Sequence, residues 1–342
     1  MKLLQATLRA ATLSLVAAFP AFAQGLDLTV DHVGIGIGDV PRVIGLRLNF
    51  RDRNLEQVDG VNATIWSSYE NGGNGVVRGL ALGLPVTGAA RIDGVGLGIL
   101  GVGTRDRFRG IGVGGLGIGG SDLEGVMIGG LGAGAGRDIK GVVIAGLGAG
   151  TGRSLQGIVI AGIGAGAGGD VTGLIVGGLG VGAGGRAKGI LVGGLGVGAS
   201  NGVEGIAIGG LGVGAAGDVT GLAIGGLGVG SSGALRGVGI GGLGVGAQEV
   251  RGLVLAGFGT GARDVRGALI SAGWNRLEGG TLRGLSISSF NQLKGTQRGL
   301  AIGIVNYTEE LHGVQLGLIN IARNNPRGTR VLPIMNVHRG DD

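Results

Sequence analysis

The chain has 342 residues, of which 88 are Gly and none is Cys, and it is 44% hydrophobic but only 3% aromatic. The small number of Pro, five, and the absence of a glycine at every third position exclude collagen, and the aliphatic partners of the glycines exclude a disordered Gly-rich chain. The formal net charge is +6, but basic residues are interleaved with acidic ones along the chain instead of being gathered into a stripe, which argues against nucleic acid as a partner.

Residues 1–23 have the organisation of a secretory signal peptide. Lys2 and Arg9 form a short basic lead, an apolar run follows over residues 10–19, and residues 21–23 (Ala-Phe-Ala) place small side chains where signal peptidase cleaves. The apolar run is too short to span a bilayer. We therefore expect export and cleavage before Gln24.

The remainder of the chain is an internal repeat. Residues 24–109 hold irregular copies and an N-terminal cap, residues 110–266 hold regular Gly-rich copies of about 16 residues, and residues 267–342 hold divergent copies and a C-terminal cap. Each copy is aligned on an opening glycine, and these glycines are Gly45, Gly60, Gly79, Gly94, Gly110, Gly125, Gly141, Gly157, Gly173, Gly189, Gly205, Gly221, Gly237, Gly252, Gly267, Gly284, Gly299 and Gly313. The array predicts one domain made of units that cannot fold singly.

One copy, residues 221–236, shows the pattern of the unit. Leu222 and Ile224 alternate with small residues, and so do Leu227 and Val229, which is the periodicity of strands. The two pairs are out of phase across a Gly-Gly pair, so that pair is expected to form a bulge or a corner. A short polar segment closes the unit and carries its charges.

The unit is compatible with two all-β architectures. In a β-solenoid each unit is one coil with a corner at the Gly-Gly pair, Leu, Ile and Val ladders inside, and a flat Gly and Ala surface outside. In a closed antiparallel β-barrel each unit is one strand and a turn. Residues 110–250 contain no aromatic residue that could form a membrane girdle, and successive units have equal lengths, so the pattern favours the solenoid. Leu179, Leu211 and Leu227 are then expected to face one interior.

The C-terminal copies resemble a family of bacterial envelope proteins. Residues 299–322 and 331–336 are similar to the "surface repeat" family, whose units read G-[LV]-Q-[IL]-G-L-I-N, and residues 315–320 (Gln-Leu-Gly-Leu-Ile-Asn) carry the match best. The central copies have Gly where the family has Asn. The resemblance implies an outer-envelope location and no assigned chemistry.

Candidate chemical sites are not supported by the motifs. The GxGxxG matches are explained by the repeat, and no P-loop is present, so no cofactor is expected. His32, His312 and His338 are far apart in sequence, and Asp170 and Asp218 recur too seldom for calcium-binding repeats, so no metal site is expected. We predict no catalytic, cofactor-binding or metal-binding residue.

The aromatic side chains are concentrated outside the regular array. We interpret them as caps over the ends of the stack rather than as a ligand box: Trp66, Tyr69, Trp274, Phe290 and Tyr307.

The sequence therefore predicts a non-enzymatic, exported structural or surface-interaction protein of a Gram-negative-type envelope, in the periplasm, in the outer membrane or on the cell surface. The alternative is an outer-membrane β-barrel or pore. The outer membrane, other envelope components and a second copy of the chain are the partner classes left open, whereas nucleic acid and a small-molecule substrate are not expected.

Overall fold

The computed structural model describes residues 25–66 and 74–338, so the predicted signal peptide, the cleavage point before Gln24, and Tyr69 lie outside the described residues. The described chain is all-β, with 79% strand and no helix. Accordingly, no helix among these residues is long and apolar enough to cross a membrane. The chain divides into two compact units, one ending at Gly152 and one beginning at Arg153.

The strands follow one another along the chain with short connections. The first unit contains β1 (Leu26–Val30), β2 (Val33–Ile37), β3 (Arg42–Arg51), β4 (Gln57–Trp66), β5 (Val76–Gly83), β6 (Val86–Gly98), β7 (Gly101–Gly114), β8 (Gly117–Gly129), β9 (Gly132–Ala145) and β10 (Gly148–Thr151). The second unit contains β11 (Ser154–Ala161), β12 (Gly164–Ala167), β13 (Val171–Gly177), β14 (Gly180–Ala183), β15 (Arg186–Gly193), β16 (Gly196–Ala199), β17 (Gly202–Gly209), β18 (Gly212–Ala215), β19 (Asp218–Gly225), β20 (Gly228–Ser231), β21 (Ala234–Gly241), β22 (Gly244–Ala256), β23 (Gly259–Ser271), β24 (Trp274–Ile287), β25 (Phe290–Ile302), β26 (Val305–Ala322) and β27 (Val331–His338).

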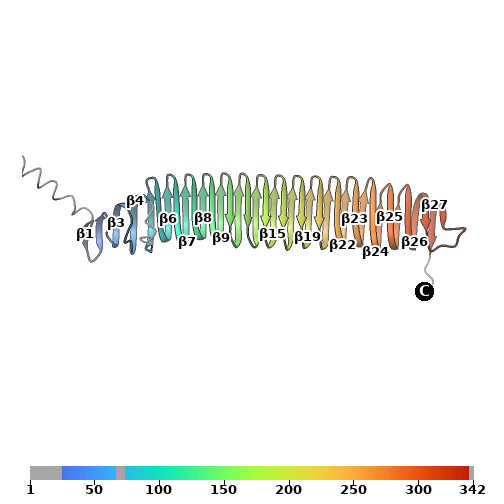
Figure 1. Cartoon of the computed structure of the whole chain (residues 1–342), viewed down its shortest axis with the longest axis horizontal. Helices are drawn as coiled ribbons and strands as arrows, with labels where there is room; N and C mark the ends of the chain where they lie inside the picture. The colour runs from blue at the N-terminus through green and yellow to red at the C-terminus, as the bar shows by residue number, and fades with distance from the viewer. Residues whose placement is uncertain (1–24, 67–73, 339–342) are drawn as a thin grey trace, which may run out of the picture. The chain divides into compact units, whose positions relative to one another are not determined.

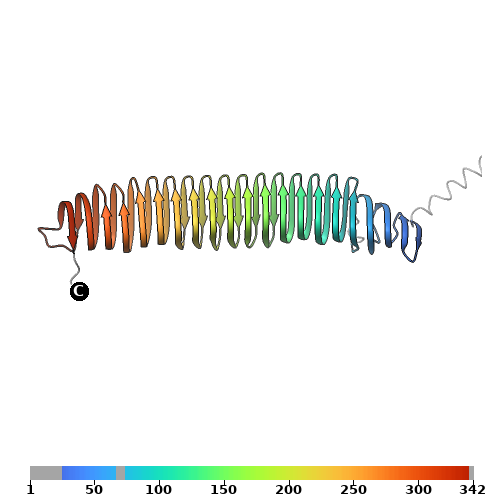
Figure 2. The ribbon, with the colours of Figure 1, turned by 180° about the vertical axis from the view of Figure 1, so that it is seen from behind.

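Within each unit the strands of successive coils pair in parallel. In the second unit the longer strands β11, β13, β15, β17, β19 and β21 pair in that order, the shorter strands β12, β14, β16, β18 and β20 pair beside them, and both series join β22. The stacked strands are visible in each unit in Figures 1 and 2.

The register of the pairing confirms the repeat. Every opening glycine of the first unit from Gly45 to Gly141 lies opposite the next. The same holds in the second unit from Gly157 to Gly313. The coils have about 16 residues, and the two units together hold about 17 turns of β-solenoid. The alternative of a closed antiparallel barrel is wrong, because each chain segment returns to lie parallel to the segment one unit earlier.

The coil that begins at Gly221 turns at three places. In the coil that begins at Gly221, strand β19 ends at Gly225 and β20 begins at Gly228, so the Gly-Gly pair starts a bend, as the sequence predicts. A second bend separates β20 from β21 in the polar segment. Gly221 itself has φ +111°, a conformation that side chains of L residues rarely adopt, and it redirects the chain within β19.

The interior differs from the predicted one. Leu179, Leu211 and Leu227 are each 50% exposed, so the prediction that they face a common interior is wrong. The bend at the Gly-Gly pair does not turn the two pairs of aliphatic residues toward one interior. Leu222 and Ile224, before the bend, also point outward. In the same coil the buried positions are Ala223, Gly225, Val229, Ser231, Ala234 and Leu235.

The space inside a coil is narrow, which explains why small residues occupy part of it. A Cβ atom on Gly225 would lie 1.9 Å from the carbonyl oxygen of Gly228, and one on Gly239 would lie 2.6 Å from Cδ1 of Leu235. Where the interior holds the larger Phe108, a Cβ on the neighbouring Gly96 would lie 2.7 Å from its ring. Interior volume is therefore shared between neighbouring positions at close-packed density, so a large inward side chain such as Leu235 or Phe108 is accompanied by a glycine beside it.

Antiparallel strands end both stacks. Strand β1 pairs antiparallel with β2, and β27 pairs antiparallel with β26. Near the first of these ends, the buried Arg47 guanidinium pairs with Asp52 and Asp39, and its Nη1 donates a 3.0 Å hydrogen bond to Oδ1 of Asn62. The interior of the first coils thus ends in a polar cluster in which the buried guanidinium is paired with two carboxylates.

The aromatic residues do not form the expected end caps. Trp274 and Phe290 stack on each other with ring centroids 5.8 Å apart, on β24 and β25, and β26 and β27 follow these strands in the stack. Tyr307 lies on β26, and Trp66 is the 42% exposed last residue of β4. The predicted cap role is therefore wrong for Trp274 and Phe290, which lie on the side of the stack.

Candidate functional site

The most concentrated chemistry of the second unit is a row of arginines on its polar side. The residue before each opening glycine is outward-facing, and parallel pairing places these residues opposite one another, about 4.8 Å apart. Five consecutive coils have Arg at this position and the next has His: Arg236, Arg251, Arg266, Arg283, Arg298 and His312. We call this set the arginine row. The expectation that basic residues do not gather into a stripe is wrong, because charges one coil apart in sequence become neighbours in space.

Carboxylates compensate only the first part of the arginine row. Arg236 forms an ion pair with Asp218, and Nε of Arg251 lies 2.7 Å from Oε1 of Glu249. Arg266, Arg283 and Arg298 have no ion pair within the part of the chain that the structure describes. The row therefore contains three successive guanidinium groups without a carboxylate partner.

The residues two positions before the arginines explain this change. Here the chain has Glu249 and Asp264, then Thr281 and Thr296, and then Glu310. The Asp264 carboxylate accepts a 2.9 Å hydrogen bond from the backbone N–H of Thr281 in the next coil. Thr296 and Thr281 are uncharged, so the segment of the row around Arg283 and Arg298 is the least compensated.

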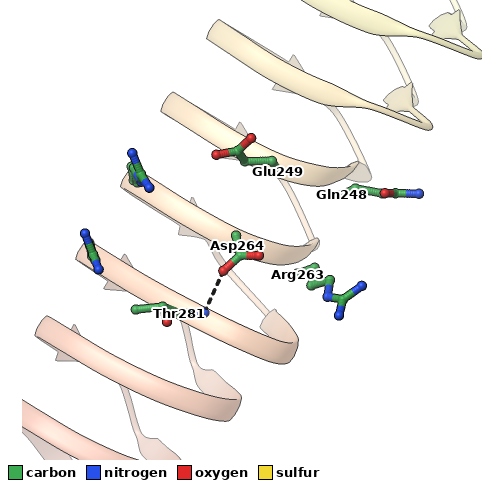
Figure 3. Close-up of a pocket in the computed structure, with 7 residues that line it drawn as sticks. Gln248, Glu249, Arg263, Asp264 and Thr281 are labelled. Atoms are coloured by element: carbon green, nitrogen blue, oxygen red, sulfur yellow. Dashed lines mark hydrogen bonds between the residues drawn. The ribbon is translucent and has the colours of Figure 1, made fainter.

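A groove of about 450 Å³ runs beside this part of the row. Arg266 and Arg283 line one part of it, and Arg263 adds a third guanidinium. Figure 3 shows Glu249, Asp264 and Thr281 on successive coils, with the Asp264–Thr281 hydrogen bond crossing between coils. The groove crosses several coils, so a ligand lying along it would meet the same residue positions repeatedly.

Two ionisable groups near the start of the row have shifted pKa values. Hydrogen bonds from the Ala234 backbone N–H, 2.8 Å from Oδ1, and from Arg236 lower the pKa of Asp218. The hydrogen bond to Glu249 raises the pKa of Arg251. Both groups are therefore held in their charged forms at neutral pH.

The aspartates considered for calcium bind backbone instead. Asp170 accepts a 2.8 Å hydrogen bond from the N–H of Arg186, and Asp218 accepts the equivalent bond from Ala234. Each carboxylate thus ties its coil to the next one. In the described residues, no group of three or more His, Asp or Glu side chains could hold a metal ion.

Two histidines that are far apart in sequence come together. The rings of His312 and His338 lie edge to face with centroids 5.7 Å apart, because β27 folds back along β26. His338 Nδ1 lies 2.6 Å from Oδ1 of Asn325. His32 lies in the turn between β1 and β2 at φ +68°.

The two polar residues of the segment that carries the surface-repeat resemblance are interior, whereas Leu318 and Ile319 of the same segment are exposed. Asn320 and Gln315 are both buried, and Nε2 of Gln315 donates a 3.2 Å hydrogen bond to Oε1 of Gln297. Asn320 ends an asparagine ladder in which Nδ2 of one residue bonds Oδ1 of the next, at 3.4, 2.7 and 2.8 Å, through Asn275, Asn291, Asn306 and Asn320.

The structural register of this ladder differs from the sequence alignment. Asn275 lies opposite Thr260, Thr260 opposite Val245, and Val245 opposite Val229. The asparagines therefore replace an interior Val of the central coils, not a Gly. The coils that hold Asn291, Asn306 and Asn320 are one residue shorter before this position, which is why an alignment on the opening glycines places Gly there.

Comparison with known proteins gives no assignment, since the chain matches no family model, no curated protein and no solved structure.

Proposed function

We propose that the chain is an exported, non-enzymatic structural and surface-interaction protein of a bacterial envelope, and that its arginine row binds a linear acidic polysaccharide. The observation that carries the proposal is the run Arg266, Arg283 and Arg298, stacked in register without carboxylate partners. Like charges directly opposite each other on neighbouring strands lower stability. An anionic ligand along the row would offset that repulsion.

The spacing of the row favours a polyuronate over other anions. Neighbouring strands are about 4.8 Å apart, so the row offers one guanidinium at each such step. A polyuronate carries one carboxylate on each sugar ring, and a ring advances the polymer by about one strand spacing. Arginine binds carboxylates through two parallel hydrogen bonds, which suits a row of single carboxylates. Each contact is weak, but several on one polymer act together.

Two sequence features support the envelope location. Residues 1–23 read as a signal peptide, and residues 315–320 resemble surface repeats of envelope proteins. A repeating array of rows also suits a scaffold that makes many equivalent contacts. The location proposed is the periplasm, the outer membrane or the cell surface of a Gram-negative-type bacterium.

The polysaccharide is tested by binding of the mature chain to polygalacturonate, with neutral dextran and duplex DNA as competitors. Arg283→Gln together with Arg298→Gln is expected to lower the affinity about 10-fold or more at low salt. The slope of log affinity against log salt should fall by about two, one for each lost ion contact. Folding should be unimpaired, because both side chains are exposed or partly exposed.

A matched control removes the same charge elsewhere on the polar side. Arg186→Gln together with Lys188→Gln changes two cations of an earlier coil, where Lys188 is paired with Glu204 at 3.1 Å and is flanked by uncharged Thr172. This control should lose less than about twofold in affinity. An equal loss in both double variants, or DNA binding tighter than polygalacturonate, would refute the proposed ligand.

Export is tested on the same preparation, recovered from the envelope fraction of a Gram-negative host. Mass spectrometry should find Gln24 as the first residue. An intact Met1 on envelope-derived protein would contradict export without bearing on the polysaccharide.

A further inference from the structure

The second unit carries a large exposed apolar face on another side of its coils. Its side chains come from the first and third residues after each opening glycine and from the bend that follows. The residues between 37% and 64% exposed are Ile158, Ile160, Ile163, Leu174, Leu179, Ile190, Leu195, Ile206, Ile208, Leu211, Leu227, Leu243 and Phe258. We call this set the apolar face. In the coils opening at Gly157 to Gly237, the ten residues after the opening glycine include no charged residue.

The rows of the apolar face lie next to each other. In the last coils, third-position and bend residues line one apolar groove of about 670 Å³, which contains Ile302 and Ile304 from one coil and Leu316 and Leu318 from the next. Ladders of equivalent residues run from coil to coil through parallel pairing. Soluble proteins rarely leave so continuous an apolar surface without a partner.

A row of glycines lies beyond the bend, at positions where no contact within the stack requires glycine. These glycines occupy outward positions of the short strands and the strands that continue them: Gly182, Gly198, Gly214, Gly230, Gly246 and Gly261. A Cβ atom on any of them would meet no atom within 4 Å, and none has a positive φ. Glycine weakens a strand interior, and its recurrence at positions without a positive φ is typical of a place where a ligand or another backbone approaches closely.

We infer that a second copy of this chain packs on the apolar face, with the bend leucines of each copy seated over the glycine row of the other. The bend leucines, such as Leu227, stand beside the surface left open at glycines such as Gly230. The bend leucines form a ridge, and the glycine row forms a groove beside it. Two copies related by a twofold axis can therefore each place their ridge in the groove of the other. Because both copies repeat at the same strand spacing, each leucine meets an equivalent glycine along the whole contact.

The area is sufficient for a stable pair. A half-exposed aliphatic side chain presents roughly 50 Å² of apolar surface, so the thirteen residues of the face present on the order of 650 Å². The glycine backbones add to this, which brings the face near the roughly 800 Å² per partner of a standard interface. A lipid surface is the less suitable occupant, since acyl chains adapt to side chains of any shape and gain nothing from a row without Cβ atoms.

The inference is independent of the polysaccharide proposal and is tested by sedimentation of the detergent-free mature chain over a range of concentrations. The wild-type chain is expected to dimerise. Gly214→Val together with Gly230→Val should raise the dimer dissociation constant about 100-fold and leave the circular dichroism spectrum unchanged. At a protein concentration where both chains are monomeric, the unfolding midpoint should be at or above that of wild type. Leu211→Asp together with Leu227→Asp, at half-exposed positions, should have the same effect on association.

The matched control is Thr220→Val, which places the same side chain at an outward position on the polar side of the same stack. It should leave the dissociation constant unchanged. A wild-type chain that stays monomeric at every concentration would overturn the inference. So would a folded Gly214→Val, Gly230→Val variant that dimerises as well as wild type. Flotation of monomeric wild-type chain with phosphatidylcholine vesicles, unaffected by the glycine substitutions, would make lipid the occupant instead.

Discussion

Gly221→Ala is expected to lower the free energy of unfolding by more than about 3 kcal/mol, whereas Gly230→Ala in the same coil leaves it unchanged or raises it slightly. Gly221 has φ +111°, and a Cβ atom there would lie 2.1 Å from the carbonyl oxygen of Gly205 in the preceding coil. Relief of that clash requires the two coils to separate, which breaks their hydrogen-bonded ladder. A Cβ atom on Gly230 would meet no atom within 4 Å, and its φ is not positive. Alanine there therefore acts only by lowering the conformational entropy of the unfolded chain.

The measurement is urea denaturation of both variants, followed by far-ultraviolet circular dichroism at a protein concentration where the chain is monomeric. Similar midpoints for Gly221→Ala and Gly230→Ala would show that the opening glycines are not required for stacking.

Leu235→Asp is expected to destabilise the chain by at least about 4 kcal/mol, whereas Leu227→Asp should destabilise the monomer by less than about 1 kcal/mol. Leu235 is fully buried, and its substitution would leave a charge without a partner between coils, while the 50% exposed Leu227 would keep a carboxylate in water. The comparison uses the same denaturation assay at a protein concentration where the chain is monomeric. Equal losses would mean that the outward and inward positions are not distinguished as the coil geometry requires.

The spacing of the opening glycines was sufficient to predict a stack of equal coils. Glycine is the residue that both a positive φ and a close carbonyl oxygen require, so a glycine such as Gly221 recurs at every coil. The Gly-Gly pair likewise predicted the bend between β19 and β20. Both features depend on backbone geometry within one coil or between adjacent coils, which a single sequence records directly.

The orientation of the side chains could not be predicted in the same way. Leu222, Ile224 and Leu227 read as the core of their coil, yet they face outward. The core is made of Ala223, Val229, Leu235 and other buried residues. Two facts hidden from the pattern decide this: the inward positions keep the same alternation on both sides of the bend, and close contacts leave no room for a side chain at inward positions such as Gly225. Hydrophobicity alone identifies the wrong face when the outer surface is itself apolar.

The arginine row was missed although its signal is present in the sequence. An Arg precedes each of the opening glycines Gly237, Gly252, Gly267, Gly284 and Gly299, and the acidic residues nearby obscured this regularity. Proximity along the chain does not reveal the row, because parallel in-register pairing makes position within the coil decide which charges are neighbours.

Deletion of one whole coil, residues 205–220, tests most directly the claim that the chain is a stack of equivalent parallel coils. The deletion joins Glu204 to Gly221 with every later residue in unchanged register, so the variant should fold with stability lowered by about one coil's contribution. Deletion of two coils, residues 189–220, should fold as well and lower stability by a second similar step. A single-coil deletion that aggregates while the two-coil deletion folds would contradict the account, because only antiparallel neighbours require an even number of units to be removed.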